Sequence, residues 1–229
     1  MSVIKTTDLM KVYTQGDFEI NALDSVSVEI DKGEFTAVVG PSGSGKTTLL
    51  NAIGGLDEPT SGSVLINDED ITQLSGNRLI DFRMRNIGFV FQAYNLIPVL
   101  TAKENVGFVM LLQGAPASER DARTAELLKA VGLGEIMNKR PNQMSGGQQQ
   151  RVAVARALAP KPQFILADEP TANLDSKSTE NLLDMMARLN KEEGITFIFS
   201  THDQRVIDRA RRVITMEDGK IISDEKRGE

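Results

Sequence analysis

The stretch GPSGSGKT, residues 40–47, has the residue types and spacing of a loop that binds phosphate groups. It fits the pattern G-x-x-x-x-G-K-[ST], in which glycines such as Gly43 and Gly45 let successive backbone N–H groups turn toward phosphate oxygens. Lys46 would reach the β- and γ-phosphates of a nucleotide, and the hydroxyl of Thr47 would ligate Mg²⁺. The alternative is a Gly-Ser turn that happens to precede a lysine.

A second segment supplies the carboxylate that such a magnesium ion requires. In FILADEP the apolar residues 164–167 predict a buried strand, so Asp168 emerges at its carboxyl end, where open α/β sheets bind ligands. Asp168 suits Mg²⁺, held directly or through water, and Glu169 could accept a proton from an attacking water or polarise it. Taken alone, an Asp-Glu pair after a strand could also be a solvated helix cap.

His202, the only histidine of the chain, follows the apolar stretch FIFS. We expect it in a loop at the same edge of the sheet as Asp168. An imidazole there can donate to a γ-phosphate oxygen and stabilise charge as the phosphate bond breaks. A lone histidine is more often a satisfied structural residue than a catalytic one, but this position favours the catalytic interpretation.

The elements that must position these residues alternate between short β-rich stretches and helical ones. This alternation predicts an α/β fold with a largely parallel core sheet. A strand at 34–40 precedes the phosphate loop and a helix follows it, and further strands are expected at 25–30, 87–91, 164–168 and 195–200. From Thr101 to about Val131 the pattern is helical, which predicts a helical insertion near the middle of the core.

Composition narrows the class of protein. The chain has 229 residues, no cysteine and a formal net charge of −6, which excludes disulfides and thiolate metal sites and disfavours general binding of nucleic acid. No apolar run approaches the ~20 residues that span a bilayer, and MSVIKTTDLM lacks an apolar core of signal-peptide length. We therefore expect a cytosolic chain, or one that is peripheral on the cytosolic side of a partner. The tail SDEKRGE, residues 223–229, is expected to be disordered.

The stretch NQMSGGQQQ, residues 142–150, looks like a phosphate loop without a lysine. Two glycines follow a serine and precede the helical stretch RVAVARALA. Glycines before a helix usually form a phosphate cradle, yet no lysine stands beside these two to bind a phosphate. The residues alone leave its ligand open.

Together, these motifs resemble those of the ATP-binding subunits of the ABC transporter family, in order and across nearly the whole chain. The matching segments are GPSGSGKT, Gln92 after IGFVF, MSGGQ, FILADE, ANLD and His202. The resemblance implies an α/β core of P-loop NTPase type with an antiparallel β subdomain and an inserted α-helical subdomain. It implies one domain over residues 1–229, with the core and β subdomain at about 1–91 and 159–229 and the helical subdomain at about 92–158.

The resemblance also implies roles that spacing could not assign. Tyr13 matches the aromatic residue on which adenine stacks, although it could be an ordinary half-buried strand tyrosine. Gln92 matches the residue that contacts Mg²⁺ and the attacking water while sensing the membrane partner; alone, it would be merely a surface polar residue. Asp175 matches the residue that links the two active sites of a dimer, although it could equally cap the following helix.

For MSGGQ the resemblance implies a ligand on another molecule. In this family the loop covers the γ-phosphate that is bound by a second copy, through Ser145 and the backbone at Gly146 and Gly147, so its own lysine is not needed. The chain departs from the commonest pattern at Met144, where leucine is usual, and at Asn173, where serine, glycine or alanine is frequent. Methionine is a near-isosteric replacement, and the effect of Asn173 on the dimer contact stays open.

The expected site residues fall into three sets. The catalytic set is Lys46, Gln92, Glu169 and His202, and the Mg²⁺ ligands are Thr47, Gln92 and Asp168. The ATP-contacting set is Tyr13, Gly40, Ser42, Gly43, Ser44, Gly45, Lys46, Thr47, Thr48, Ser145, Gly146, Gly147, Gln148 and Asp175.

Within the family, GDFEINALDSVSVEI, GFVFQAYNLIPVLTAKENV and PNQMSGGQQQRVAVARALA resemble the branch that contains LolD, MacB and FtsE. This implies an ATPase subunit that forms a homodimer around two ATP and drives an integral membrane permease. The work would be export, lipoprotein release or mechanotransmission, from a peripheral position on the cytoplasmic side of the inner membrane.

Two other functions stay open. The first is a cell-division-type ABC ATPase that regulates a membrane partner without transport. The second is a DNA-repair-type ABC ATPase, which the compact stretch between Gly45 and Ser145 disfavours because it has no sustained heptads and no cysteine. The stretch NLIPVL, residues 95–100, could face the permease or belong to the core of the helical subdomain.

Overall fold

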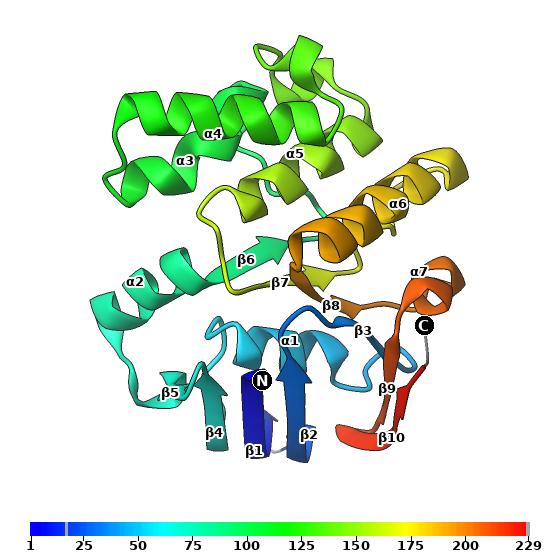
Figure 1. Cartoon of the computed structure of the whole chain (residues 1–229). Helices are drawn as coiled ribbons and strands as arrows, with labels where there is room; N and C mark the ends of the chain where they lie inside the picture. The colour runs from blue at the N-terminus through cyan, green and yellow to red at the C-terminus, as the bar shows by residue number, and fades with distance from the viewer. Residues whose placement is uncertain (17, 228–229) are drawn as a thin grey trace.

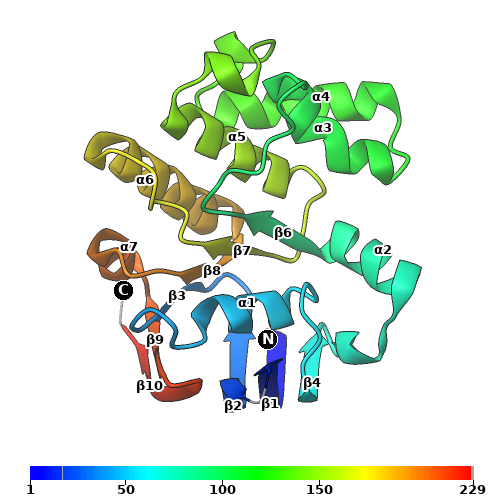
Figure 2. The same ribbon diagram turned by 180° about the vertical axis from the view of Figure 1, so that it is seen from behind.

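The structure of the protein is a computed structural model that describes residues 1–16 and 18–227. Within these residues, a six-stranded sheet forms the centre of the molecule, a four-stranded antiparallel sheet lies on one side of it, and a group of helices lies on the other (Figures 1 and 2). None of the helices in this described part is both long and apolar enough to cross a membrane.

The central sheet has the strand order β10-β9-β3-β8-β7-β6. Its members are β3 (Phe35–Val39), β6 (Ile87–Val90), β7 (Phe164–Asp168), β8 (Thr196–Ser200), β9 (Arg212–Glu217) and β10 (Lys220–Lys226). All neighbours pair in parallel except β10, which pairs antiparallel with β9. The prediction of an α/β fold with a largely parallel core sheet is confirmed.

The predicted disorder of the tail is wrong for residues 223–226. These residues belong to β10, where Ser223 and Lys226 are register partners of Thr215 and Arg212 on β9. A strand that pairs along an existing sheet edge satisfies its backbone groups there, so a charged and exposed composition does not prevent order. Residues 228–229 of the predicted tail lie outside the described residues.

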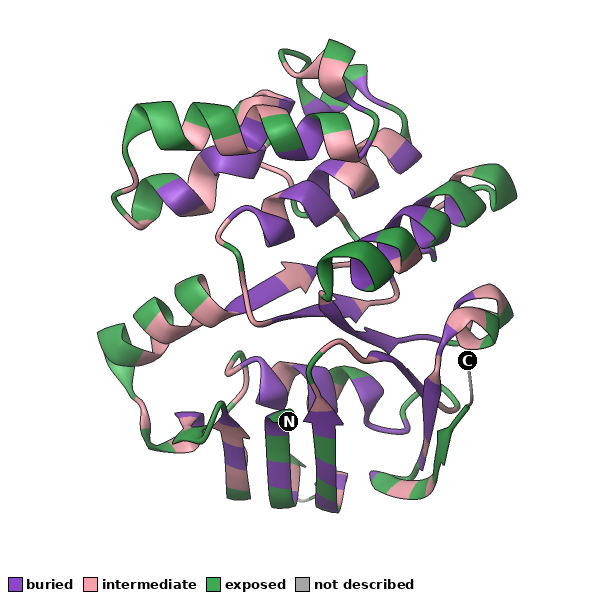
Figure 3. Ribbon diagram, in the orientation of Figure 1, coloured by how far each residue is buried: buried purple, intermediate pink, exposed green. Residues whose placement is uncertain are grey.

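The strands of the central sheet are apolar on both faces because both faces are covered. On β7, Ile165 and Ala167 pack into the apolar cluster on the face of the sheet that the group of helices covers. Phe164 and Leu166 pack into the cluster on the opposite face, toward the antiparallel sheet. The period-two alternation of a strand assigns successive side chains to these two cores. Figure 3 shows the result, with the central strands buried and the outer side of α6 (Ser176–Glu193) exposed.

The antiparallel sheet has the order β2-β1-β4-β5, with β1 (Ser2–Gln15), β2 (Phe18–Asp31), β4 (Ser61–Ile66) and β5 (Glu69–Asp70). Apolar residues of β1, β2 and β4 pack on α1 (Lys46–Ile53), which covers one face of the central sheet. This arrangement confirms the antiparallel β subdomain that the family resemblance implied.

The remaining helices do not all lie on the face opposite α1, because Leu79 and Phe82 of the first of them pack against the cluster that contains α1. They are α2 (Gly76–Asn86), α3 (Ala102–Leu112), α4 (Ala117–Ala130), α5 (Gly146–Leu158), α6 and α7 (Gln204–Arg209), with the 3₁₀ turns Ile71–Gln73, Gly134–Ile136 and Pro141–Gln143. Helices α3, α4 and α5 share one apolar cluster, which confirms an inserted helical part. The boundaries at about 92 and 158 stay a prediction.

A capping box begins α3. The Thr101 hydroxyl accepts from the Glu104 backbone N–H at 3.3 Å, and the Glu104 carboxylate accepts from the Thr101 N–H at 2.8 Å. In the preceding stretch NLIPVL, the core interpretation holds for Leu96, and contact with a permease stays a prediction. Leu96 packs against the helical cluster, whereas Val99 is 71% exposed.

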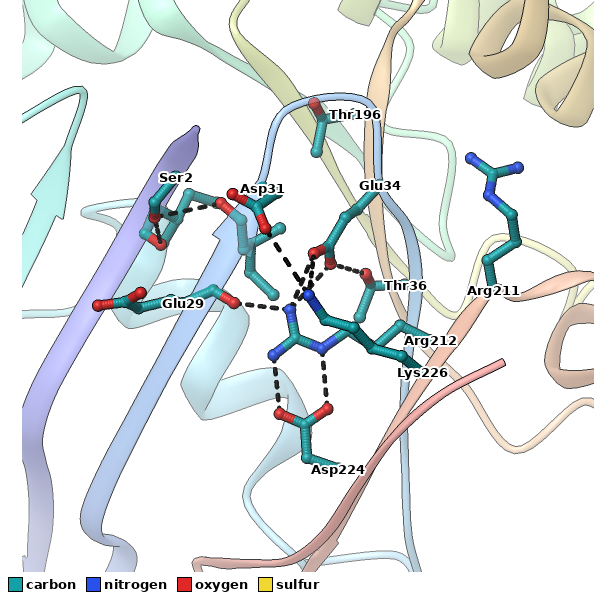
Figure 4. Close-up of polar contacts among 12 residues, drawn as sticks. Ser2, Glu29, Asp31, Glu34, Thr36, Thr196, Arg211, Arg212, Asp224 and Lys226 are labelled. Atoms are coloured by element: carbon teal, nitrogen blue, oxygen red, sulfur yellow. Dashed lines mark hydrogen bonds and ion pairs between the residues drawn. The ribbon is translucent and has the colours of Figure 1, made fainter. Parts of the chain in front are cut away.

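One buried arginine links the two sheets (Figure 4). Arg212 of β9 donates to the Glu29 carbonyl of β2 at 2.6 Å, to the Glu34 carboxylate at 2.9 Å and to Asp224 of β10 at 2.7 and 2.8 Å. Its hydrogen bonds lower the pKa of the Asp224 carboxyl. Because the arginine side chain is only 8% exposed, these partners are needed to offset its lost hydration.

Candidate active site

The phosphate loop connects β3 to α1 at the carboxyl edge of the central sheet. Gly45 is the N-cap of α1, in a left-handed conformation with φ +99°, and no side chain caps the helix there. A Cβ on Gly45 would lie 2.3 Å from the Ala22 carbonyl oxygen, and one on Gly40 would lie 2.1 Å from that of Met216. Only glycine fits at these two positions, and the N-terminal N–H groups of α1 stay free of side-chain caps for an anion.

The side chain of Lys46 folds back onto the phosphate loop. Its ammonium donates to the carbonyl oxygens of Gly40 and Pro41 at 2.9 and 2.8 Å, and the residue is only 8% exposed. Beside it, the buried hydroxyl oxygen of Ser44 has no hydrogen-bond partner among the described residues. The loop therefore holds one cation on its own carbonyl groups and one unsatisfied hydroxyl in its interior.

The carboxylates lie where parallel strands end. Asp168, the last residue of β7, is the register partner of Ser200, the last residue of β8. The Asp168 carboxylate accepts from the Thr47 hydroxyl at 3.0 Å, so the phosphate loop and β7 meet at this pair. The next residue, Glu169, has φ +45° and donates its backbone N–H to the Ser200 carbonyl at 2.9 Å.

His202 reaches the same point from β8. Its Nδ1 lies 2.7 Å from the Oε1 atom of Glu169, and the Thr201 hydroxyl lies 3.4 Å from Oε2. The Glu169 side chain is 17% exposed and that of His202 is 74% exposed. The carboxylate is therefore mostly buried, and the imidazole faces solvent.

A cleft of about 660 Å³ joins these groups. It is lined by the whole loop from Gly40 to Thr48, by Gln92, Glu169 and His202, by Ala172, and by residues 20–22 of β2. The structure thus brings together Lys46, Thr47, Gln92, Glu169 and His202, as the sequence predicts. Ala172 belongs to ANLD and residues 20–22 to GDFEINALDSVSVEI, but sequence reasoning assigned neither of them to the cleft, because their place in the lining follows from packing.

Tyr13 lies at the border of this cleft. Tyr13 is not itself among the lining residues, but its strand partner Ile20 and the first-turn residue Thr48 of α1 both line the cleft. Tyr13 itself is 40% exposed and donates its hydroxyl to the Asp57 carboxylate. The expected purine-stacking residue is therefore next to the phosphate loop, at the end of the cleft nearest β1.

The MSGGQ residues are not among the residues that line the cleft. Ser145 is the N-cap of α5, where it forms a capping box with Gln148 at 3.3 and 2.9 Å. Asp175 caps α6 in the same way, accepting from the Ser178 N–H at 2.9 Å and from its hydroxyl at 2.6 Å. These bonds lower the pKa of Asp175. Within one chain, these residues serve as helix caps away from the phosphate loop.

Gln92 belongs to a network that joins three motif segments. Asn173 donates its side-chain amide to the Gln92 carbonyl at 3.0 Å, and the Tyr94 hydroxyl donates to the Asn173 carbonyl at 3.3 Å. Tyr94 and the following Asn95 both have positive φ, and Arg156 of α5 donates to both of their carbonyl groups. The unusual Asn173 thus holds the backbone of the Gln92 loop.

A sequence model of the ABC transporter family matches residues 23–172 of the chain. That span includes the phosphate loop, the Gln92 segment, MSGGQ and the end of β7. The chain belongs to the ABC transporter family. Within this family it is an ATPase cassette, as the motif order implied.

Three relatives illustrate the branch. An ABC transporter ATP-binding protein of Thermotoga maritima is 50% identical over 226 residues, which are 99% of this chain and 96% of the relative. The lipoprotein-releasing system ATP-binding protein LolD 1 of Rhodopseudomonas palustris is 48% identical, over 96% of this chain and 98% of the relative. The macrolide export ATP-binding/permease protein MacB of Hyphomonas neptunium is 49% identical over 97% of this chain. The chain spans only 34% of that MacB.

A solved structure has the same fold. The ATP-binding cassette MJ0796, in a dimeric post-hydrolysis state bound to ADP and Pi, matches with a TM-score of 0.90 and 45% identity, over 99% of this chain and 100% of that chain. The predicted ABC ATPase fold and the resemblance to the LolD and MacB branch are therefore confirmed.

Proposed function

We propose that this chain is the ATP-binding and ATP-hydrolysing subunit of an ABC transporter complex, in which two copies close on two ATP and drive a membrane permease. The observation that carries the proposal is the cleft in which Glu169 and His202 face the phosphate loop. In this proposal Lys46 exchanges the carbonyl groups of Gly40 and Pro41 for phosphate oxygens, and the free N–H groups at the start of α1 bind the same phosphates.

Mg²⁺ fits the pair formed by Thr47 and Asp168. A hydroxyl and a carboxylate 3.0 Å apart are oxygen ligands of the kind that this ion prefers, and Gln92 lines the same cleft. When bound, the ion would neutralise phosphate charge. Both residues are then held in place by their own elements, since Thr47 is in the first turn of α1 and Asp168 ends β7.

Glu169 and His202 would have different roles in ATP hydrolysis. Glu169 would accept a proton from the attacking water, which requires an ionised carboxylate close to the phosphates. His202 would donate to the γ-phosphate oxygen as charge develops. A neutral imidazole has one ring proton, so it can donate either to Glu169 or to phosphate, whereas an imidazolium can donate to both. With a neutral imidazole, the phosphate and Glu169 would therefore compete for the one ring proton.

The dimer follows from the separation of Ser145 from the cleft of its own chain. Ser145, Gly146 and Gly147 begin α5, so their N–H groups and the helix dipole can bind the γ-phosphate held by a second copy. Asp175, at the start of α6, would contact the opposite site in the same dimer. Support comes from the dimeric state of the cassette MJ0796.

Support for a permease partner comes from the names of the relatives. Since LolD is named for lipoprotein release and MacB for macrolide export, we propose export, lipoprotein release or mechanotransmission from the cytoplasmic side of the inner membrane. The chain would be peripheral there, bound through the permease, with no nucleic acid partner.

Isolation of the native complex from membranes tests the proposal. We expect the purified chain to carry an integral membrane protein, identified by mass spectrometry, and to hydrolyse ATP. Recovery of nucleic acid without a membrane protein would contradict the transporter assignment and favour the DNA-repair type. A membrane partner without coupled transport would favour the cell-division type instead.

A further inference from the structure

Three side chains form a compact cluster at the border of the cleft. Lys11 and Tyr13 lie two residues apart on β1, and Asp57 lies in the loop after α1. The Lys11 ammonium is 2.5 Å from the Asp57 Oδ1 atom, and the Tyr13 hydroxyl donates to Oδ2. One carboxylate therefore binds both the cation and the phenol.

Lys11 also covers one face of the tyrosine. Its ammonium lies over the Tyr13 ring, 5.0 Å from the centroid, and donates to the Glu58 carbonyl at 2.7 Å. A cation at this distance is attracted by the ring face. Because Lys11 covers one face and the hydroxyl is bound, the ring has a fixed orientation. A planar group could therefore stack only on its other face.

The anchor of this cluster is the helix that begins at the phosphate loop. The backbone N–H groups of Leu56 and Asp57 donate to the Asn51 carbonyl at 2.8 and 3.3 Å, so the loop is attached to the end of α1. On the strand side, the Val12 N–H donates to the Thr60 hydroxyl at 3.0 Å. Since α1 begins at Lys46, one rigid helix sets the distance between the phosphate loop and the tyrosine.

The charges in the cluster are balanced. The side chains of Lys11 and Asp57 are 14% and 25% exposed, so each needs the other to offset lost hydration. Burial opposes ionisation of Asp57, but hydrogen bonds from Lys11 and Tyr13 lower its pKa. Burial and the bond to Asp57 raise the pKa of Tyr13, so the phenol keeps the proton that it donates.

We infer that Lys11 and Asp57 are positioning residues that hold the Tyr13 ring as a preformed platform for the purine base of the nucleotide. The inference rests on the proposed ATP site and adds to it two residues that no motif marks. A ring held in advance loses little conformational freedom when a base stacks on it, so the cluster would contribute to ATP affinity and not to the chemical step.

The test compares a ligand that has a base with one that lacks it. We measure kcat and KM for ATP, and the affinity for inorganic tripolyphosphate by competition, in Lys11→Met, Asp57→Asn and Tyr13→Phe. Loss of the cation–ring contact or of the phenol hydrogen bond should raise KM for ATP about three- to tenfold and leave kcat within about twofold. The affinity for tripolyphosphate should stay unchanged, which also shows that each variant is folded.

A matched control lies on the same strand. Lys5 forms an exposed ion pair with Glu29 at 2.5 Å, so Lys5→Met removes an equivalent charge far from the ring and should leave KM unchanged. Because the chain has no tryptophan, Tyr13→Trp provides a single reporter at the platform. Its fluorescence should be quenched by ATP and not by tripolyphosphate, and Lys11→Met in the same background should raise the ATP concentration needed.

The outcomes separate this inference from the proposed function. If the protein hydrolyses ATP but Lys11→Met and Asp57→Asn alter only thermal stability, the cluster is a structural link between β1 and α1 and the inference is wrong. If the unmodified protein binds neither ATP nor tripolyphosphate, the proposed nucleotide site itself is wrong.

Discussion

The Nδ1 atom of His202 lies 2.7 Å from the Oε1 atom of Glu169. The two residues follow different strands and are brought together because β7 and β8 pair in parallel and end at the register pair Asp168 and Ser200. The carboxylate is mostly buried and the imidazole is mostly exposed, so the histidine is the more accessible member of the pair.

Glu169→Gln should separate nucleotide binding from hydrolysis. The amide keeps the size of the side chain but cannot accept a proton from water, so ATP hydrolysis should slow by about 10²- to 10⁴-fold while ATP still binds. Size-exclusion chromatography with ATP should then show a long-lived dimer. A variant that stays monomeric with normal turnover would refute the catalytic role.

Lys46→Ala should weaken nucleotide binding itself. Removal of the ammonium takes away a charge-assisted contact to phosphate, so ATP affinity should fall about tenfold or more. The carbonyl groups of Gly40 and Pro41 lose their donor as well, and a thermal melt shows whether the loop still holds its shape. Unchanged ATP affinity in a folded variant would count against the phosphate-loop assignment.

Asn173→Ser should loosen the Gln92 loop without unfolding the protein. The change removes the amide donor to the Gln92 carbonyl, and Tyr94→Phe removes the second bond of the same network. Each variant should lower kcat a few-fold, with about 1 kcal/mol or less of lost stability. The double variant should lose less than the product of the two single effects, because both bonds hold one loop. Strict additivity would show that the bonds act independently.

Asp224→Asn should change how stability depends on pH. Arg212 lowers the pKa of Asp224 in the folded state below the ordinary value of about 3.9, so its stabilising effect is present above that value and is lost as pH falls through the folded pKa. At pH 7 the variant should be less stable by about 1 kcal/mol, a low figure because the carboxylate is 37% exposed and screened by water.

Urea denaturation at several pH values measures this effect. The difference between the unmodified protein and the variant should be constant from about pH 5 upward and should shrink below about pH 4. Asp184→Asn is a suitable control, because its contact with Arg209 lies on the surface and its side chain is 68% exposed. If the difference in stability grew as the pH fell, the predicted direction of the pH dependence would be wrong.

Site residues whose positions depend on the backbone pattern of a single segment could be predicted from the sequence. Gly45 and Lys46 are recognisable because a strand, a glycine turn and a helix follow one another directly, and Glu169 and His202 because each follows an apolar strand. The parallel order of these strands then requires the side chains to meet at one edge.

Residues that act through contacts with distant parts of the chain could not be predicted from the sequence. Lys11 and Asp57 are 46 residues apart, and their ion pair depends on how β1 lies against the end of α1. The same is true of Asn173, whose partner Gln92 is 81 residues away, and of β10, whose order comes from pairing with β9. In each case the local sequence is compatible with several environments.

The sequence by itself determined the family, the α/β core and most of the motif residues that line the cleft, since these depend on short motifs attached to strand ends. Only the tertiary structure decided which side chains join distant segments: Asp57 accepts from the Tyr13 hydroxyl, Asn173 donates to the Gln92 carbonyl, and Arg212 links the two sheets. The physical reason is that hydrogen bonds and ion pairs act over about 3 Å, so they form only after the hydrophobic cores have set the distance between elements.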